Sequence, residues 1–327
     1  MVNDADPKRM RTLRDRYQSC TCPNVIFTCA TAQNLEKYLR ISSTSNVPSV
    51  QFNRIICDVP CSGDGTFRKS PHLWRLFRPR FGAELHPLQL DIAKCCLRLL
   101  RVGGRLIYST CSLNPIEDEA VVSALLLYAW EQGMNLRLAD PVTMETSSGS
   151  DDRPTSLMQR RLPGMKYRPG VRTWRCDEDV LLAGEKDGPE RQESVARLPP
   201  VLPSMSPQVP EASPLADCMC LERCMRIVPQ DMNTGGFFVA VLELHSGPPP
   251  AEYVMSRQEP PEGGASKKRP LTSMCAGASG DDEDEHRRRS LKTFHELGYN
   301  PKVATNGADI DVAMTLLPSR QHKMTHT

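Results

Sequence analysis

Two cysteine-containing loops hold the residues of this sequence that are best suited to covalent chemistry. The segment 58–66 reads DVPCSGDGT and contains Cys61, and the segment 108–115 reads YSTCSLNP and contains Cys111. A cysteine in a tight turn before a helix gains thiolate character and can attack a substrate. Cys111 meets this condition, because Asn114 and the proline after it are typical of a helix start. The alternative is that both cysteines are small residues packed in turns, as buried cysteines commonly are.

The elements around the two loops predict how the loops are brought together. Apolar runs at 54–58 and 105–110 are predicted strands, and each cysteine loop follows one of them. Between them, apolar residues at helical spacing predict a helix over 88–100, and a second helix is expected from 114 to 133. This alternation is typical of a parallel, doubly wound α/β sheet, in which ligands bind at the carboxyl ends of the strands. If the two strands are neighbours, both thiols face one crevice.

The rest of the chain divides into one large domain and a tail. A buried strand is expected at 237–242, so the catalytic domain is predicted to span 1–245. Within it, a proline-rich insertion at about 185–216 is expected to be disordered. The segment 246–327, with its acidic and basic runs, is expected to be a low-complexity, mostly disordered tail.

Composition excludes several classes of protein. The 41 basic and 39 acidic residues nearly cancel, which excludes a globally basic nucleic-acid binder but not a local basic groove. No apolar run is long enough for a transmembrane helix, and the first residues lack the apolar core of a secretory signal. The 13 cysteines are therefore expected to be reduced thiols of an intracellular protein. Cys218, Cys220 and Cys224 do not have zinc-site spacing, so no metal is expected.

The two loops, in this order and spacing, resemble the Sun-domain (Nop/Sun) family of RNA (cytosine-5) methyltransferases, and its tRNA-modifying branch in particular. LPGMK at 162–166, RPG at 168–170 and TGGFF at 234–238 agree with that branch, and the resemblance extends over about residues 1–245. It implies a Rossmann-like, S-adenosylmethionine-dependent fold with a parallel sheet and a final antiparallel strand. It also implies methylation of carbon 5 of cytosine in RNA, expected to be tRNA.

The resemblance assigns a role to each thiol. Cys111 would attack carbon 6 of the cytosine, which turns the ring into an enamine that accepts a methyl group. Cys61 would assist release of the methylated base by removing a proton. Asp58 would hold the cytosine edge or the methyl donor near the reacting atoms.

The cofactor-binding part of the family pattern is only partly present. The first strand and its Gly-rich loop are missing, so the chain is expected to be N-terminally truncated, with the sheet edges beside that strand left unpaired. Residues 2–6 match the end of the second strand, which makes Asp4 the acid expected to bind the ribose hydroxyls. The position expected to contact adenine holds Thr31, a poorer hydrogen-bond acceptor.

Basic residues between the cysteine loops are candidates for RNA contact. Arg68, Lys69 and Arg75 could hold phosphates, and Trp74 among them could stack on a base; a solvated basic face and a buried tryptophan are equally open alternatives. The motif at 267–270, KKRP, favours nuclear or nucleolar residence, although a solvated tail has the same composition. The alternative function is a non-catalytic RNA-binding or scaffold protein derived from the enzyme.

Overall fold

One mixed sheet organises the protein. The computed structural model describes residues 1–17, 24–39, 50–141, 164–183, 195, 198–258 and 313–316. The strand order is β2-β1-β9-β3-β4-β8-β7-β6, and β5 also pairs with β8. The strands are β1 (Val2–Asn3), β2 (Phe27–Thr28), β3 (Phe52–Asp58), β4 (Leu100–Thr110), β5 (Asn135–Leu138), β6 (Arg168–Pro169), β7 (Met225–Ile227), β8 (Phe237–His245) and β9 (Ala313–Leu316).

The helices are mostly short, with two long ones against the sheet. The α-helices are α1 (Pro7–Tyr17), α2 (Leu35–Tyr38), α3 (Leu73–Leu76), α4 (Arg80–Arg98), α5 (Glu119–Glu131), α7 (Glu178–Leu181), α9 (Pro214–Met219), α10 (Pro229–Met232) and α11 (Ala251–Gln258). Single 3-10 turns are η1 (Ala32–Asn34), η2 (Asp64–Thr66), η3 (Pro203–Met205) and η4 (Leu221–Arg223). Within the described ranges, none of these helices is long and apolar enough to cross a membrane.

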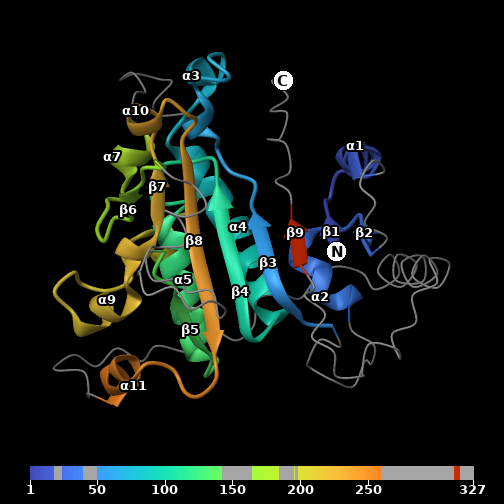
Figure 1. The fold of residues 1–327 in the computed structure, drawn as a ribbon. Coiled ribbons are helices and arrows are strands. Elements are labelled where there is room, and N and C mark those ends of the chain that lie inside the picture. The colour runs from blue at the N-terminus through green and yellow to red at the C-terminus, as the bar shows by residue number, and fades with distance from the viewer. Residues whose placement is uncertain are drawn as a thin grey trace.

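The sheet confirms the predicted α/β class. Strands β1, β2, β3, β4 and β9 pair in parallel, whereas β8 runs antiparallel to β4. Helices α4 and α5 lie side by side behind the central strands in Figure 1 and contact each other. Their apolar faces bury residues such as Leu97 and Leu125 against Tyr108 and Phe238 of the sheet.

The register of β3 against β4 fixes the position of the cysteine loops. Asp58, at the end of β3, pairs with Ser109, one residue before the end of β4. The two loops therefore leave neighbouring strands at the same level of the sheet, as the sequence predicts. Figure 1 shows α3 beyond these carboxyl ends.

Two segments expected to lack structure are part of the fold. Strand β9, from the predicted tail, lies between β1 and β3, where the sequence predicts unpaired edges. Its backbone groups pair with both neighbours, which removes the cost of unpaired groups inside a sheet. In the predicted disordered insertion, Met205 is fully buried and its carbonyl accepts a hydrogen bond from Trp174 Nε1 at 2.7 Å. Helix α11 also lies in the predicted tail; the domain boundaries stay predictions, and the motif at 267–270 lies outside the described residues.

Candidate active site

The two predicted cysteines are in direct contact. Cys61 Sγ and Cys111 Sγ are 3.2 Å apart, and both thiols are free. Cys61 is buried and Cys111 is partly exposed. The two loops thus bring the thiols together, as the sequence predicts.

The contact between the thiols makes them unequal acids. A hydrogen bond from Cys61 lowers the pKa of Cys111, against the opposing effects of burial and of the nearby Asp58, Glu117 and Asp64 carboxylates. The same hydrogen bond, together with burial and the charge on Cys111, raises the pKa of Cys61 well above its usual value. The pair therefore favours a thiolate on Cys111 with Cys61 as the S–H donor. All other cysteines with a shifted pKa in the described part of the chain are shifted upward.

Asp58 lies at the same edge and is also perturbed. Burial raises its pKa from 3.8 to about 6, although a hydrogen bond from Ser109 and the charge of Arg9 act in the opposite direction. Ser109 Oγ donates to Asp58 Oδ1 at 3.2 Å. An acid that is hard to ionise, beside a stabilised thiolate, is typical of catalytic sites.

A very close approach of three loops fixes the backbone at Cys111. Gly65 N donates to the Cys111 carbonyl at 3.0 Å, and Gly236 N donates to the Gly65 carbonyl at 2.6 Å. A Cβ on Gly65 would lie 2.7 Å from each of the Cys111 and Gly236 carbonyl oxygens. Only glycine fits at position 65, so the loop of Cys61, the loop of Cys111 and the segment before β8 are locked together.

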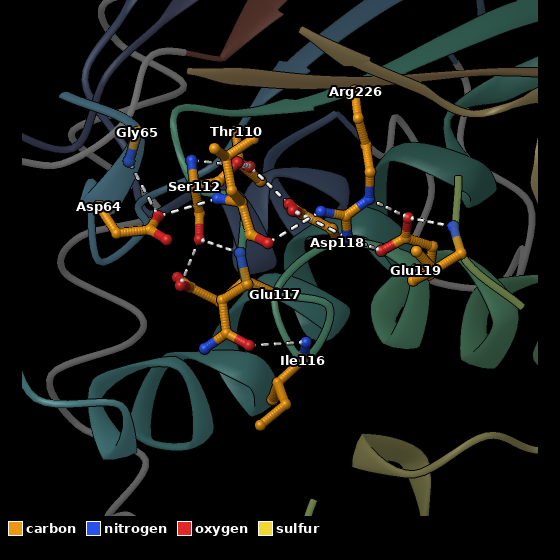
Figure 2. Close-up of polar contacts among 12 residues, drawn as sticks. Asp64, Gly65, Thr110, Ser112, Ile116, Glu117, Asp118, Glu119 and Arg226 are labelled. Carbon is orange, nitrogen blue, oxygen red and sulfur yellow. Dashed lines mark hydrogen bonds and ion pairs between the residues drawn. The ribbon is translucent and has the colours of Figure 1, made fainter. Parts of the chain in front are cut away.

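Two carboxylates that sequence reasoning missed, the partly buried Asp64 and the fully buried Glu117, also join the cysteine loops. Asp64 Oδ1 accepts hydrogen bonds from Gly65 N at 3.0 Å and Leu113 N at 2.9 Å. Glu117, which the helix-start pattern predicts to cap its own helix, instead bonds Ser62 and Ser112. Figure 2 shows Ser112 between Asp64 and Glu117.

The sequence contains a feature that could have indicated the burial of Glu117. Glu117, Asp118 and Glu119 are three consecutive acids, and all three are fully buried. Such a run normally lies on a solvated face, but here Ile116 precedes it and buried apolar residues follow it directly. Burial raises the pKa of Glu117 and raises that of Asp118 well above its usual value. Glu119 is neutralised by Arg226, whose Nε donates to its Oε1 at 2.6 Å (Figure 2).

The predicted cofactor residues differ in their surroundings. Asp4 is buried at the end of β1, where its Oδ1 accepts hydrogen bonds from Arg9 Nη2 at 2.6 Å and Asp6 N at 2.8 Å. Its other oxygen, Oδ2, is buried without a hydrogen-bond partner. Thr31 is exposed, and its hydroxyl accepts a hydrogen bond from Asn34 Nδ2 at 3.1 Å.

The predicted RNA-contact residues lie on the surface beyond the cysteine loops. Arg68, Lys69 and Arg75 are exposed, and Arg68 also bonds Asn233. Trp74 on α3 is 71% exposed, and its ring contacts Phe67 edge-on at 5.1 Å. Of the two alternatives for Trp74, the structure therefore supports the exposed one. Across the described ranges, no group of three or more His, Cys, Asp or Glu side chains is arranged to hold a metal ion.

Comparison with known proteins gives consistent matches. A family model described as 16S rRNA methyltransferase RsmB/F matches residues 1–170. The chain is 38% identical over 251 residues to a multisite-specific tRNA:(cytosine-C(5))-methyltransferase of Schizosaccharomyces pombe, which covers 74% of this chain and 33% of that protein. It is 36% identical over 245 residues to the multisite-specific tRNA:(cytosine-C(5))-methyltransferase of Saccharomyces cerevisiae, with coverage of 74% and 31%.

Among solved structures, a methyltransferase homolog protein from Pyrococcus horikoshii is 19% identical. The structural match covers 75% of this chain and 53% of the Pyrococcus horikoshii chain, with a TM-score of 0.41. The chain spans about a third of the length of the curated relatives it matches.

Proposed function

This chain belongs to the family described as 16S rRNA methyltransferase RsmB/F, and from that premise we propose that it methylates carbon 5 of a cytosine in RNA through a covalent bond to Cys111. The observation that carries the proposal is the contact between the two thiols, 3.2 Å apart, in which the pKa of Cys111 is lowered. A thiolate is the form of cysteine that attacks an electron-poor ring carbon.

The reaction begins with the Cys111 thiolate. Its sulfur forms a bond to carbon 6 of the cytosine, and the electron pair of the 5,6 double bond moves to carbon 5. S-adenosylmethionine would supply the electrophilic methyl group that carbon 5 accepts, with S-adenosylhomocysteine as the leaving group. Removal of the proton on carbon 5 then restores the double bond and expels the Cys111 thiolate.

Cys61 is suited to remove that proton, because its acidity depends on the state of Cys111. Two of the causes that raise the pKa of Cys61 are its hydrogen bond to Cys111 and the charge on Cys111. Both disappear when Cys111 is bonded to the cytosine ring, so the pKa of Cys61 falls at that stage. After losing its own proton to solvent, its thiolate acts as the general base.

Asp58 and Asp4 have the properties that the substrate and the methyl donor require. With a pKa of about 6, Asp58 is mostly ionised at neutral pH and can accept a hydrogen bond from the cytosine amino group. The unpartnered Oδ2 of Asp4 fits a ribose hydroxyl of S-adenosylmethionine, since a buried acceptor without a donor is costly. Thr31 contributes less, because it is exposed and bonded to Asn34.

The surface beyond the cysteine loops supports contact with RNA. Arg68, Lys69 and Arg75 place positive charge there, and Trp74 offers an exposed ring next to them. Basic side chains hold phosphates and aromatic rings stack on unpaired bases. A base must leave its stack to reach a thiol, and this surface would hold the strand on one side of it.

We propose tRNA as the RNA substrate, on the basis of the two fungal relatives named for tRNA that each cover 74% of this chain. Nuclear import through the motif at 267–270 stays a prediction.

Denaturing gels with RNA test the proposal. With S-adenosylmethionine and a tRNA transcript, we expect Cys61→Ala to accumulate a covalent protein–RNA adduct and Cys111→Ala to form none. RNA binding without an adduct in either the parent chain or Cys61→Ala would contradict it and favour a binding protein without this activity. Mass spectrometry of the adduct should locate the bond at Cys111, and a bond at Cys61 would reverse the assigned roles.

A further inference from the structure

Glu117 bonds the residues that directly follow both cysteines. Its Oε1 accepts hydrogen bonds from Ser62 N at 2.8 Å and Gln89 Nε2 at 3.0 Å. Its Oε2 accepts from Ser62 Oγ at 2.5 Å and Ser112 Oγ at 2.8 Å. The side chain is fully buried, so these contacts form in a low-dielectric environment where charged hydrogen bonds are strong.

We propose that Glu117 is a positioning residue that holds the Cys61 and Cys111 loops in register and so keeps the two thiols in contact. The consequence for catalysis rests on the proposed function, whereas the consequence for the distance between the thiols does not.

The hydrogen-bond directions explain why a carboxylate is suited to this place. Asn114 N donates to Ser112 Oγ at 3.0 Å, which leaves the Ser112 hydroxyl proton for Glu117. The Ser62 amide and the Gln89 side-chain amide can only donate. Four donors thus converge on one side chain, and an ionised carboxylate has about four acceptor positions and no donor.

The network also reaches the helix and the strand that support the loops. Gln89 belongs to α4, and its Nε2 also donates to the Pro60 carbonyl at 2.8 Å. Tyr108 in β4 donates its hydroxyl to the Glu117 carbonyl at 2.6 Å. Glu117 therefore joins both cysteine loops to rigid elements, as precise positioning of a reactive group requires.

Disulfide trapping tests the positioning without RNA or methyl donor. Diamide oxidises two thiols to a disulfide and takes up their two protons and two electrons, so the yield of the Cys61–Cys111 cross-link, measured by mass spectrometry, reports their distance. We expect Glu117→Ala to slow this cross-link about tenfold, the factor that corresponds to ~1.4 kcal/mol. We expect Glu117→Gln to retain more of the rate than Glu117→Ala, because the Ser62 and Ser112 hydroxyls can rotate to accept from the amide.

Glu36→Gln is the matched control. Glu36 is also a buried carboxylate, but it pairs with Arg98 and lies beside Cys95 rather than in the network that joins the Cys61 and Cys111 loops. It should lower thermal stability and leave the cross-linking rate unchanged. An unchanged cross-linking rate in Glu117→Ala, or an equal loss of cross-linking rate in Glu36→Gln, would overturn the proposal. If Glu117→Ala does not fold, Ser112→Ala takes its place, since it removes one of the four donors to Glu117. An unchanged cross-linking rate there would overturn the proposal equally.

RNA adduct formation then separates the two proposals. A displacement of about 1 Å in a reacting group can cost about 100-fold in rate, so we expect Glu117→Ala to form the adduct about 100-fold more slowly in single-turnover experiments. If the parent chain forms no adduct while Glu117→Ala still slows the cross-link, the proposed function fails and the positioning role stands. If Glu117→Ala forms the adduct at the parent rate, the positioning role fails and the proposed function stands.

Discussion

Replacing Asp58 with asparagine should make the protein more stable at neutral pH. The pKa of Asp58 rises from 3.8 to about 6 because burial disfavours the charged form. The difference is about two pKa units, and each unit corresponds to ~1.4 kcal/mol, which gives an upper limit of about 3 kcal/mol. Asp58 is only partly buried and solvent screens part of this effect, so we expect Asp58→Asn to raise the free energy of unfolding by ~1–2 kcal/mol at pH 8.

The size of this gain depends on pH in a defined way. Above pH 6, Asp58 is charged in the folded and unfolded states, and the folded state carries the full cost of burying the charge. Below the unfolded pKa, near 3.8, it is neutral in both states and the cost disappears. The gain from Asp58→Asn should therefore be largest at pH 8 and narrow to less than about 1 kcal/mol at pH 4.5.

Urea unfolding followed by tryptophan fluorescence, at pH 8 and pH 4.5, measures both effects. Asp231→Asn is the matched control, because hydrogen bonds from Arg168 lower the pKa of Asp231, so the same chemical change should lower stability at pH 8. The reasoning is refuted if Asp58→Asn destabilises the protein at pH 8, or stabilises it equally at both pH values. Methylation by Asp58→Asn should fall even though stability rises, which would identify Asp58 as a group kept for function at a cost in stability.

Three further substitutions test separate parts of the structure. Gly65→Ala adds a Cβ 2.7 Å from the Cys111 carbonyl oxygen, so RNA adduct formation should fall by about 100-fold in single-turnover assays, and a normal rate would disprove the close approach. Arg226→Met leaves buried Glu119 without its ion-pair partner and should cost about 3–5 kcal/mol in urea unfolding; a loss below about 1 kcal/mol would contradict a stabilising role for this buried pair. Thr315→Pro removes a backbone donor from β9, so amides of β1 and β3 should exchange faster with deuterium while those between β4 and β8 stay protected, and unchanged exchange would contradict the pairing of β9.

The cysteine site was predictable because local patterns determine it. Each cysteine follows a short apolar run, and parallel strands joined by a helix place their carboxyl ends at one edge of the sheet. The register of Asp58 with Ser109 confirms that inference. The assignment of Cys111 as the nucleophile comes from a family resemblance and stays a prediction, and the lowered pKa of Cys111 is a property that this role requires.

The features that were not predictable depend on contacts distant in sequence. Glu117 has the spacing of a helix-capping residue, but its oxygens bond Ser62, 55 residues earlier. Strand β9 contains part of a short apolar run, VAMTLL at 312–317, which sequence reasoning overlooked within the expected tail. Its place between β1 and β3 comes from pairing with strands far away in the sequence. Local periodicity does not reveal the partner in either contact, because each partner lies far away in the sequence.

If Cys61 acts as proposed, the electrostatics of the site predict that it contributes before the attack of Cys111 as well as at product release. Burial and the Asp58, Glu117 and Asp64 carboxylates all raise the pKa of Cys111, and the hydrogen bond from Cys61 is what lowers it. Cys61→Ala removes that hydrogen bond, so fewer molecules carry the Cys111 thiolate at neutral pH and the RNA adduct forms more slowly. The same substitution removes the base that ends the reaction, so the adduct that does form persists. If Cys61 first activates Cys111 and later removes the proton from carbon 5, the RNA adduct of Cys61→Ala should accumulate slowly but reach a high final yield. If Cys61 acts only as the base at release, the initial rate of adduct formation in Cys61→Ala should equal that of the parent chain.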